Sequence, residues 1–539
     1  MPEGEEEKFM NFLLWLGAIG PVIVLFAAMS VFHIKTEWAA LLGLICAIAA
    51  SLAVGQSELR IAVMDLEKGA FSALNILIVI WPAIFLYEML EYADIFRSIR
   101  RVIQKQTQDE LMLILLISWL FSSFLQGITG FGVPVAVCAP LLIAIGVAPV
   151  WSVIITLLGH AWANTYGTFA LAWDALVTQS ETAGIFQTKL LAGCFLWGIN
   201  LAGALLTCWL YGRGRAVRHM LPFVFTVSVI HGGGQLCISL VNSTIAAFLP
   251  ATAALAAAWL ILLAGGYKNP WSLPSKLLER KGAEREALNR TKDERTSVPS
   301  GAAAVFPFVL LAAVSVLVLL VRPVHDILYP FVIELSFPDA ETGRGFYVEA
   351  ADSYGSIHLL THAGFVLLFT AAVTYLGYRS RGLLKKKQMG QILSATMKKI
   401  IPTSAGILFL VMMAQVLKGS GLMEIVARGV TDVSGNLYGA AVPFVGLLGA
   451  FVTSSNTSSN ILLGSFQKTA AELISANEAA VLAAQTAGGA IGTVVGPSTI
   501  LLGTTTAGCK GKEGNILRFM LPIVAVEALF TGIATMLLV

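Results

Sequence analysis

Long apolar runs separated by short polar or basic stretches fill this chain from end to end. A run of at least about 17 residues lets an α-helix cross the hydrocarbon core of a bilayer. Such runs lie near residues 9–32, 37–55, 71–92, 111–148, 150–177, 188–211, 220–266, 303–322, 357–378, 399–418, 437–464, 478–507 and 516–538. Some are long enough for two crossings or a hairpin. The pattern therefore predicts an all-α polytopic membrane protein with roughly 12 to 14 transmembrane helices.

Two of these runs are interrupted by polar and flexible residues. The first break lies in SSFLQGITGFGVPVAV at 122–137, and the second lies in GAFVTSSNTSSNILLG at 449–464. Inside a bilayer, a broken helix is tolerated only where its freed backbone groups are buried in protein or line a watery cavity. Two breaks in corresponding places indicate a solute site near the midplane, as in secondary transporters.

The basic residues gather in a few connecting segments and predict the orientation of the chain. Segment 268–300 holds eight Lys or Arg residues, whereas 323–356 holds only Arg344 beside six acidic residues. Because cytoplasmic loops carry the excess of Lys and Arg, the first segment is predicted inside and the second outside. The acidic amino terminus then falls outside. It lacks the basic region and cleavage site of a secretory signal, so the first apolar run is expected to be retained.

The same threading divides the chain into two halves of opposite orientation. The first break is entered from the cytoplasmic side and the second from the outside. We therefore expect two inverted repeats with discontinuous helices or reentrant hairpins. The expected boundaries are an N-terminal transmembrane half at 1–267, a solvated cytoplasmic linker at 268–302 and a C-terminal transmembrane half at 303–539.

Composition agrees with the membrane class and argues against several others. Hydrophobic residues make up 57% of 539 positions and charged residues 12%, against about 25% charged in soluble proteins. The net charge of +3 does not indicate nucleic acid, and the six cysteines, with no CxxC pair, are expected to be packing residues. With no HExxH, nucleophile–base set or P-loop, the sequence predicts neither an enzyme nor a primary pump, and no cofactor or metal. A channel would instead offer rings of repeated residues or subunit symmetry.

Three stretches together resemble a known family: FSSFLQGITGFGVPVAV, GAFVTSSNTSSNILLGSFQ and AAQTAGGAIGTVVGPSTI. They are similar to those of the L-lactate permease family of proton-coupled carboxylate symporters. The resemblance implies uptake of lactate, glycolate or a related 2-hydroxy acid with a proton across the inner cell membrane. Relatives commonly carry EGxxGFG, whereas this chain has the neutral Gln126 in place of the acid. Sodium coupling or a different organic anion therefore stays open, as does a homodimeric state.

The residue types at the breaks suit a small carboxylate. Half-helix N-termini supply free backbone N–H groups, glycines allow close approach of the backbone, and amides and hydroxyls add donors. An alternative is a reentrant loop or a close helix contact built on small residues, and for 483–508 the two interpretations are equally favoured. The predicted substrate-binding residues are Gln126, Gly127, Thr129, Gly130, Gly132, Thr453, Ser454, Ser455, Asn456, Thr457, Ser458, Ser459, Asn460, Gln485 and Thr486.

Ionisable residues inside membrane segments are costly and so are candidates for function. His160 and Asp174 lie in LLGHAWANTYGTFALAWDAL, and either could carry the coupling proton in place of the missing acid. The alternative is a hydrogen-bonded core histidine and an aspartate at the outer interface. HGGGQ at 231–235 breaks another apolar run, but it lacks the preceding strand that a phosphate loop needs.

Overall fold

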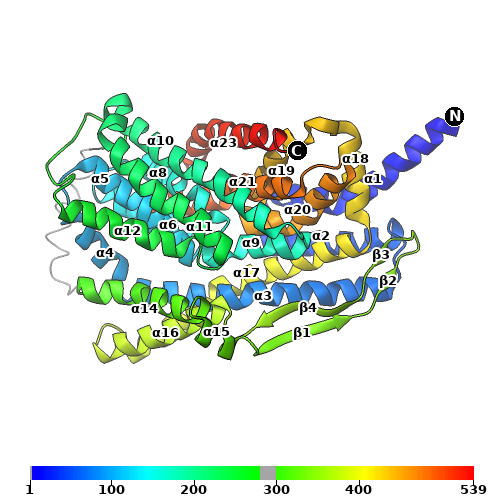
Figure 1. Ribbon diagram of the computed structural model, residues 1–539, viewed down its shortest axis with the longest axis horizontal. Helices are drawn as coiled ribbons and strands as arrows, with labels where there is room; N and C mark the ends of the chain where they lie inside the picture. The colour runs from blue at the N-terminus through cyan, green and yellow to red at the C-terminus, as the bar shows by residue number, and fades with distance from the viewer. Residues whose placement is uncertain (1–2, 131, 280–298) are drawn as a thin grey trace.

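Helices running mostly along the long axis build an elongated body (Figure 1). The computed structural model describes residues 3–130, 132–279 and 299–539. Within these residues, nine helices are long and apolar enough to cross a membrane, and three shorter apolar helices accompany them. The chain is thus a multi-pass, almost entirely helical membrane protein. Of the predicted linker, residues 268–279 and 299–302 lie within the described chain, and the rest lies outside the described residues.

Two helices of 34 residues each, α3 (Leu59–Tyr92) and α17 (Lys386–Gly419), pack side by side along the body. Their contact is close, since a Cβ at Gly69 would lie 2.5 Å from Met412 Cα. Two further helices pack on this pair and two more pack on those, and we call all six the long-helix frame. The other four are α1 (Glu3–Ser30), α2 (Thr36–Ala53), α14 (Gly301–Leu319) and α16 (Ala363–Ser380).

Short helices follow the long ones. α4 (Ile95–Gln104) comes after α3, while α18 (Leu422–Ser434) and the 3-10 turn η4 (Gly435–Leu437) come after α17. Both α4 and α18 begin at a residue with left-handed backbone, Asp94 with φ 56° and Gly421 with φ 73°. Such a residue reverses the direction of the chain at little cost when it is glycine or a short polar residue.

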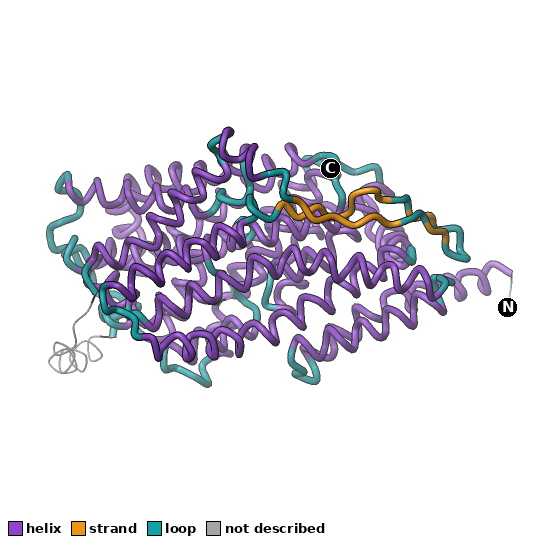
Figure 2. Tube along the Cα trace, turned by 90° about the horizontal axis from the view of Figure 1, so that it is seen from below, coloured by secondary structure: helices purple, strands orange, loops and turns teal. Residues whose placement is uncertain are grey.

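The acidic segment predicted outside the membrane contains short strands. After α15 (Arg322–Leu328), β1 (Val332–Phe337) pairs antiparallel with β4 (Ala351–His358), and β2 (Ala340–Glu341) pairs with β3 (Tyr347–Val348). These strands lie along one side of the helical body (Figure 2). The all-α class therefore describes the membrane part, and mostly exposed strands between α14 and α16 add a small β-ribbon that the sequence did not predict.

Four apolar runs form paired half-helices, which together we call the broken-helix group. The first run comprises α5 (Glu110–Leu115), the π-helix η1 (Leu116–Phe121), α6 (Ser122–Ile128) and, after the break, α7 (Val133–Ile143). The second comprises α8 (Pro149–His160), the 3-10 turn η2 (Ala161–Asn164) and α9 (Gly167–Ser180). The third comprises α19 (Tyr438–Thr453) and α20 (Asn456–Leu473), and the fourth α21 (Glu478–Thr493) and α22 (Pro497–Thr506).

The remaining helices cover the broken-helix group. α10 (Ile185–Ser228) packs on α8 and α21 and is interrupted at Gly212 and Arg213, between the predicted apolar runs 188–211 and 220–266. It continues through the π-helix η3 (Val229–Gly233) into α11 (Gly234–Val241), and α12 (Phe248–Leu263) follows. α23 (Glu513–Met536) packs on α19 and α21. Half-helices and merged helices explain why nine long spans stand beside the 12 to 14 predicted ones.

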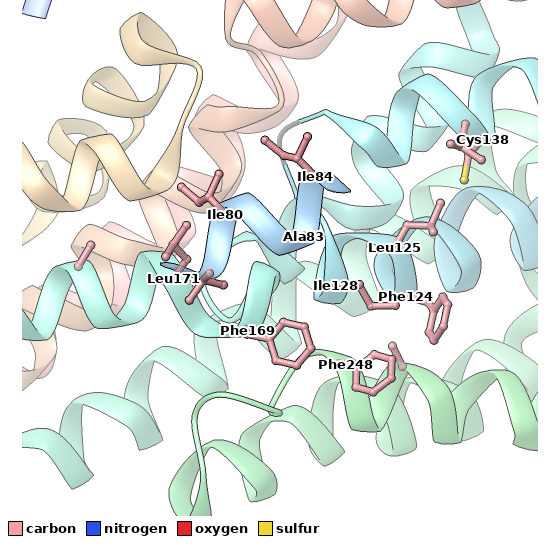
Figure 3. Packing of buried hydrophobic residues seen from close by; sticks show 14 of the residues in the cluster. Ile80, Ala83, Ile84, Phe124, Leu125, Ile128, Cys138, Phe169, Leu171 and Phe248 are labelled. Atoms are coloured by element: carbon pink, nitrogen blue, oxygen red, sulfur yellow. The ribbon is translucent and has the colours of Figure 1, made fainter. Parts of the chain in front are cut away.

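Aromatic side chains fix the first broken run against its neighbours (Figure 3). The ring of Phe248 on α12 lies 5.6 Å from that of Phe124 on α6 and 6.0 Å from that of Phe169 on α9. Ile80 and Ile84 of α3 belong to the same buried cluster. Contacts of this kind tie the half-helices to one another and to the frame, so that the breaks are held in fixed positions.

Candidate functional site

The first break turns on glycine. Gly130 and Gly132 have φ of 57° and 76°, which is the left-handed region that glycine enters freely. A Cβ at Gly130 would lie 2.1 Å from Thr168 Oγ1 on α9, and one at Gly127 would lie 2.9 Å from Phe248 Cα. The Thr129 hydroxyl donates a hydrogen bond to the Leu125 carbonyl at 2.9 Å. These glycines therefore serve the turn and the packing.

The second break turns on serine. Ser454 has φ 55°, and Ser455 caps α20 by accepting a hydrogen bond from the Ser458 N–H at 3.1 Å. Such capping uses one of the free donors at a helix N-terminus and leaves others for a ligand. Thr457, in the first turn of α20, forms no side-chain hydrogen bond within the described part of the chain. The positive end of this half-helix is therefore available to an anion.

The two other broken runs reach the same place. In α9, Thr168, Phe169 and Ala170 have φ of 51°, 56° and 66°, a strained conformation for residues with a Cβ. Backbone strain of this kind concentrates at functional sites. At the start of α22 the Ser498 N–H donates to Ser454 Oγ at 3.1 Å. The breaks at 454–455 and 494–496 are thus in direct contact.

A buried hydrogen-bond network joins the two halves of the chain. Asn456 Nδ2 donates to Thr165 Oγ1 and to the Thr486 carbonyl, both at 3.2 Å. Asn460 Nδ2 donates to the Ala172 carbonyl at 2.8 Å and to Thr486 Oγ1 at 2.9 Å. These bonds connect α20 to α21 and to residues of the second broken run. Since buried amides are costly when unpaired, the network fixes how the breaks face each other.

A cavity of about 350 Å³ lies where the breaks meet. Its volume falls at the lower end of the range for small-molecule sites. The lining comes from α6, α8, η2, α9, α19, α20, α21 and α22 of the broken-helix group and the breaks between them, and from α2 and α17 of the long-helix frame. It thus combines both predicted breaks in one concave site that holds many polar side chains beside apolar ones.

The predicted residues divide into two sets. Nine line the cavity: Gln126, Gly132, His160, Thr453, Ser454, Ser455, Asn456, Thr457 and Ser458. The others lie outside the lining: Gly127, Thr129, Gly130, Asp174, Ser459, Asn460, Gln485 and Thr486. Most of the second set holds the first in place. Gln485 Nε2, for example, donates to Ser459 Oγ at 3.1 Å, and Ser459 in turn donates to the Gly446 carbonyl at 2.8 Å.

The two predicted proton carriers occupy different environments. His160 is 3% exposed, lines the cavity and places Nδ1 2.6 Å from the Thr156 carbonyl. That contact makes Nδ1 the protonated nitrogen of the neutral ring and leaves Nε2 as an acceptor. Asp174, one turn or more beyond the strained part of α9, is exposed and does not belong to the lining.

Segment 483–508 contains both of the features that the sequence left open. Gly488 and Gly492 support close packing of α21 on α19, since a Cβ would lie 2.0 Å from the Pro443 carbonyl oxygen and 2.4 Å from that of Leu447. Thr493, Ser498 and Thr499 line the cavity. The glycines therefore serve helix packing, while the residues around the break at 494–496 contribute to the site.

Sequence reasoning missed the contribution of the long-helix frame. Thr36 and Glu37 at the start of α2, and Pro402, Thr403 and Gly406 in α17, line the cavity opposite the breaks. Pro402 inside the long helix α17 is the local sequence signal on that side. Glu37 lies at the edge of an apolar run. An acidic residue is common in the first turn of a helix, so its position did not indicate a functional role.

The described lining contains no lysine or arginine. Its titratable side chains are Glu37 and His160. Positive potential must therefore come from helix N-termini. α20 begins at the cavity with Asn456, and the first turn of α22 lines it with Ser498. Amides and hydroxyls complete a donor-rich surface suited to a small polar anion.

The architecture defines the class: a polytopic membrane transporter with a polar cavity at the junction of broken helices. A family model described as L-lactate permease matches residues 15–539, so the chain belongs to the L-lactate permease family. It is a transporter of this family and not an enzyme.

Known proteins of similar sequence carry permease names. An L-lactate permease of Streptococcus iniae is 25% identical over 464 residues, covering 85% of this chain and 91% of that protein. The glycolate permease GlcA of Escherichia coli K12 is 24% identical over 551 residues, covering 97% and 95%. Among solved structures, MtrF of Neisseria gonorrhoeae, from a class of antimetabolite efflux pumps, has a TM-score of 0.45 at 13% identity, covering 88% of this chain and 82% of that chain.

Proposed function

We propose that this protein is a secondary active transporter that imports a small carboxylate, namely lactate, glycolate or a related 2-hydroxy acid, together with a proton. The observation that carries the proposal is that one cavity is lined by both breaks, with Gln126 from the first and Thr453–Ser458 from the second. The names of the relatives, L-lactate permease and glycolate permease, support this substrate class.

The lining can satisfy each group of a 2-hydroxy acid. The carboxylate takes N–H groups at the start of α20, where the helix dipole favours negative charge, and the Thr457 hydroxyl. The 2-hydroxyl is both donor and acceptor, so it pairs with an amide such as that of Gln126. Leu171, Ile407 and Leu410 provide apolar surface for a methyl or methylene group.

The order of elements supports two repeats. Two series of seven helices follow one another at a nearly constant separation of about 330 residues, and both long helices have 34 residues. The paired starts are Leu59 and Lys386, Ile95 and Leu422, Glu110 and Tyr438, Val133 and Asn456, Pro149 and Glu478, Gly167 and Pro497, and Ile185 and Glu513. We propose that the repeats are inverted, with the amino terminus outside the inner cell membrane, as the basic loops predict.

Alternating access follows from this arrangement. The cavity lies between the broken-helix group and the long-helix frame, so a movement of one against the other exposes it to each side in turn. Coupling to protons supplies the energy, and His160 is the predicted carrier that faces the solute. Asp174 is the weaker of the two candidates because it lies outside the lining.

Uptake into proteoliposomes tests the proposal. Labelled lactate, glycolate and a panel of other small organic acids are offered under an imposed proton gradient or an imposed sodium gradient. We expect a 2-hydroxy acid to accumulate under the proton gradient alone. Accumulation under the sodium gradient alone would show that sodium, and not the proton, is the coupling ion. If none of the panel acids moved, the proposed substrate class would be wrong. Flux that only equilibrates the acid would indicate a channel.

A further inference from the structure

Glu37 introduces a charge problem into the proposed site. It lines the cavity from the first turn of α2, and no lysine or arginine of the described lining offsets it. Two negative charges 4 Å apart repel by about 1 kcal/mol even in water and by about 4 kcal/mol near a protein surface. An anionic substrate therefore binds poorly while the Glu37 carboxylate is ionised.

The surroundings of Glu37 do not remove this charge. In the described chain no ion pair to Glu37 is present. His33 and Lys35 precede α2 in the loop, and Lys398 and Lys399 lie a turn before Pro402 on α17. Lys399 Nζ pairs instead with Glu88 Oε1 at 2.5 Å. On the far side of the cavity, His160 is the titratable group.

We propose that Glu37 is the proton-binding group that couples substrate to protons in this transporter. The inference rests on the proposed function. It assigns proton binding to Glu37, because the neutral Gln126 cannot carry a proton. Protonation removes the repulsion and converts the side chain into an O–H donor for the substrate carboxylate. By linkage, a proton that strengthens substrate binding is itself held more tightly once substrate is bound.

Position supports Glu37 over the residues predicted from sequence. Its side chain is half-buried, so it exchanges protons with water at the cavity, whereas His160 is 3% exposed. Glu37 also belongs to the long-helix frame: a Cβ at Gly406 of α17 would lie 3.8 Å from its Cα. The substrate donors belong to the broken-helix group. Proton and solute therefore meet across the boundary that has to move.

The transport cycle then balances as follows. Glu37 takes a proton from water on the side of higher proton concentration, and the neutral acid admits the anion. Substrate and proton leave together on the other side, where the carboxylate is regenerated. One proton accompanies one monoanion, so the loaded step moves no net charge, and a gradient of one pH unit sustains an accumulation of about tenfold.

The variant Glu37→Gln tests this role because glutamine imitates the protonated acid. We expect the KM for lactate to become independent of pH between about pH 5 and 8, whereas that of the wild type rises with pH. Proton-driven accumulation should fall from about tenfold per pH unit to a ratio of about one. Exchange of labelled for unlabelled lactate should persist, which shows that the variant folds and binds. Glu37→Asp should retain coupling.

Glu58→Gln is the matched control, since it makes the same acid-to-amide change at an exposed residue outside the cavity. It should keep the wild-type pH profile. Proton-driven accumulation by Glu37→Gln would overturn the inference, as would a folded variant that loses exchange together with accumulation, because Glu37 would then have a structural role. A wild type that accumulates none of the panel acids under a proton gradient would overturn the proposed function and this inference with it.

Discussion

The two predicted breaks both interrupt a membrane helix at the cavity, but they do so with different residue types. At 126–132 the chain turns on glycines, and the side chain of Gln126 faces the cavity. At 453–460 hydroxyls and amides dominate, and several are already engaged: Asn460 and Ser459 bond to α9, α19 and α21. A polar run in a membrane helix is therefore not equivalent to a binding site. Part of it satisfies the buried backbone and part of it faces the solute.

Close packing beneath the second break gives the largest expected effect. A valine at Gly488 would place its Cβ about 2.0 Å from the Pro443 carbonyl oxygen, and backbone cannot yield as a side chain can. We expect Gly488→Val to lower the free energy of unfolding by more than about 3 kcal/mol, or to abolish folding. Gly198→Val on α10 is the control, because no atom lies within 4 Å of its Cβ. Equal melting temperatures of the two purified variants would contradict this packing.

The division of labour within the second break gives the next effect. Asn460 is fully buried and donates two hydrogen bonds outside the cavity lining. We expect Asn460→Ala to cost about 1–3 kcal/mol of stability and to leave the KM of the folded fraction unchanged. Thr457→Val should do the reverse: unchanged stability and a KM raised about tenfold, since a bond to a charged ligand is lost. Thermal melts and uptake kinetics distinguish the two variants. A raised KM in both would contradict the assignment of Asn460 to structure and of Thr457 to substrate binding.

Much of the fold could be predicted from the pattern of apolar and polar residues in the sequence, whereas part of the site could not. Long apolar runs and polar interruptions mark the broken helices, since each has a local cause in solvation. The pairing of Asn456 with Thr165 links residues far apart in the chain, and no local pattern encodes it. The left-handed run at Thr168–Ala170 uses residues that do not favour it, so tertiary contacts impose it. No local sequence pattern marked Glu37, because its proposed role depends on residues from distant segments that line the same cavity.

The first break gives the smallest and most informative effect. Gln126→Glu would place a second carboxylate on the cavity, in addition to the one that Glu37 already contributes. In a water-filled cavity the added repulsion is about 1 kcal/mol at 4 Å, so we expect the KM for lactate at pH 7.5 to rise about fivefold. The sign follows from the charge: as pH falls and the new acid is protonated, the difference from wild type should disappear.

Measurement of KM against pH for Gln126→Glu also sharpens the comparison of the two breaks. Gln126→Asn serves as the control because it shortens the side chain without adding charge. An acid at position 126 that faces the solute must make binding depend on one more proton, so the KM of Gln126→Glu should rise more steeply with pH than that of the wild type. An unchanged slope would mean that the anion sits against the second break alone. The first break would then be a turn that shapes the cavity without contacting its contents.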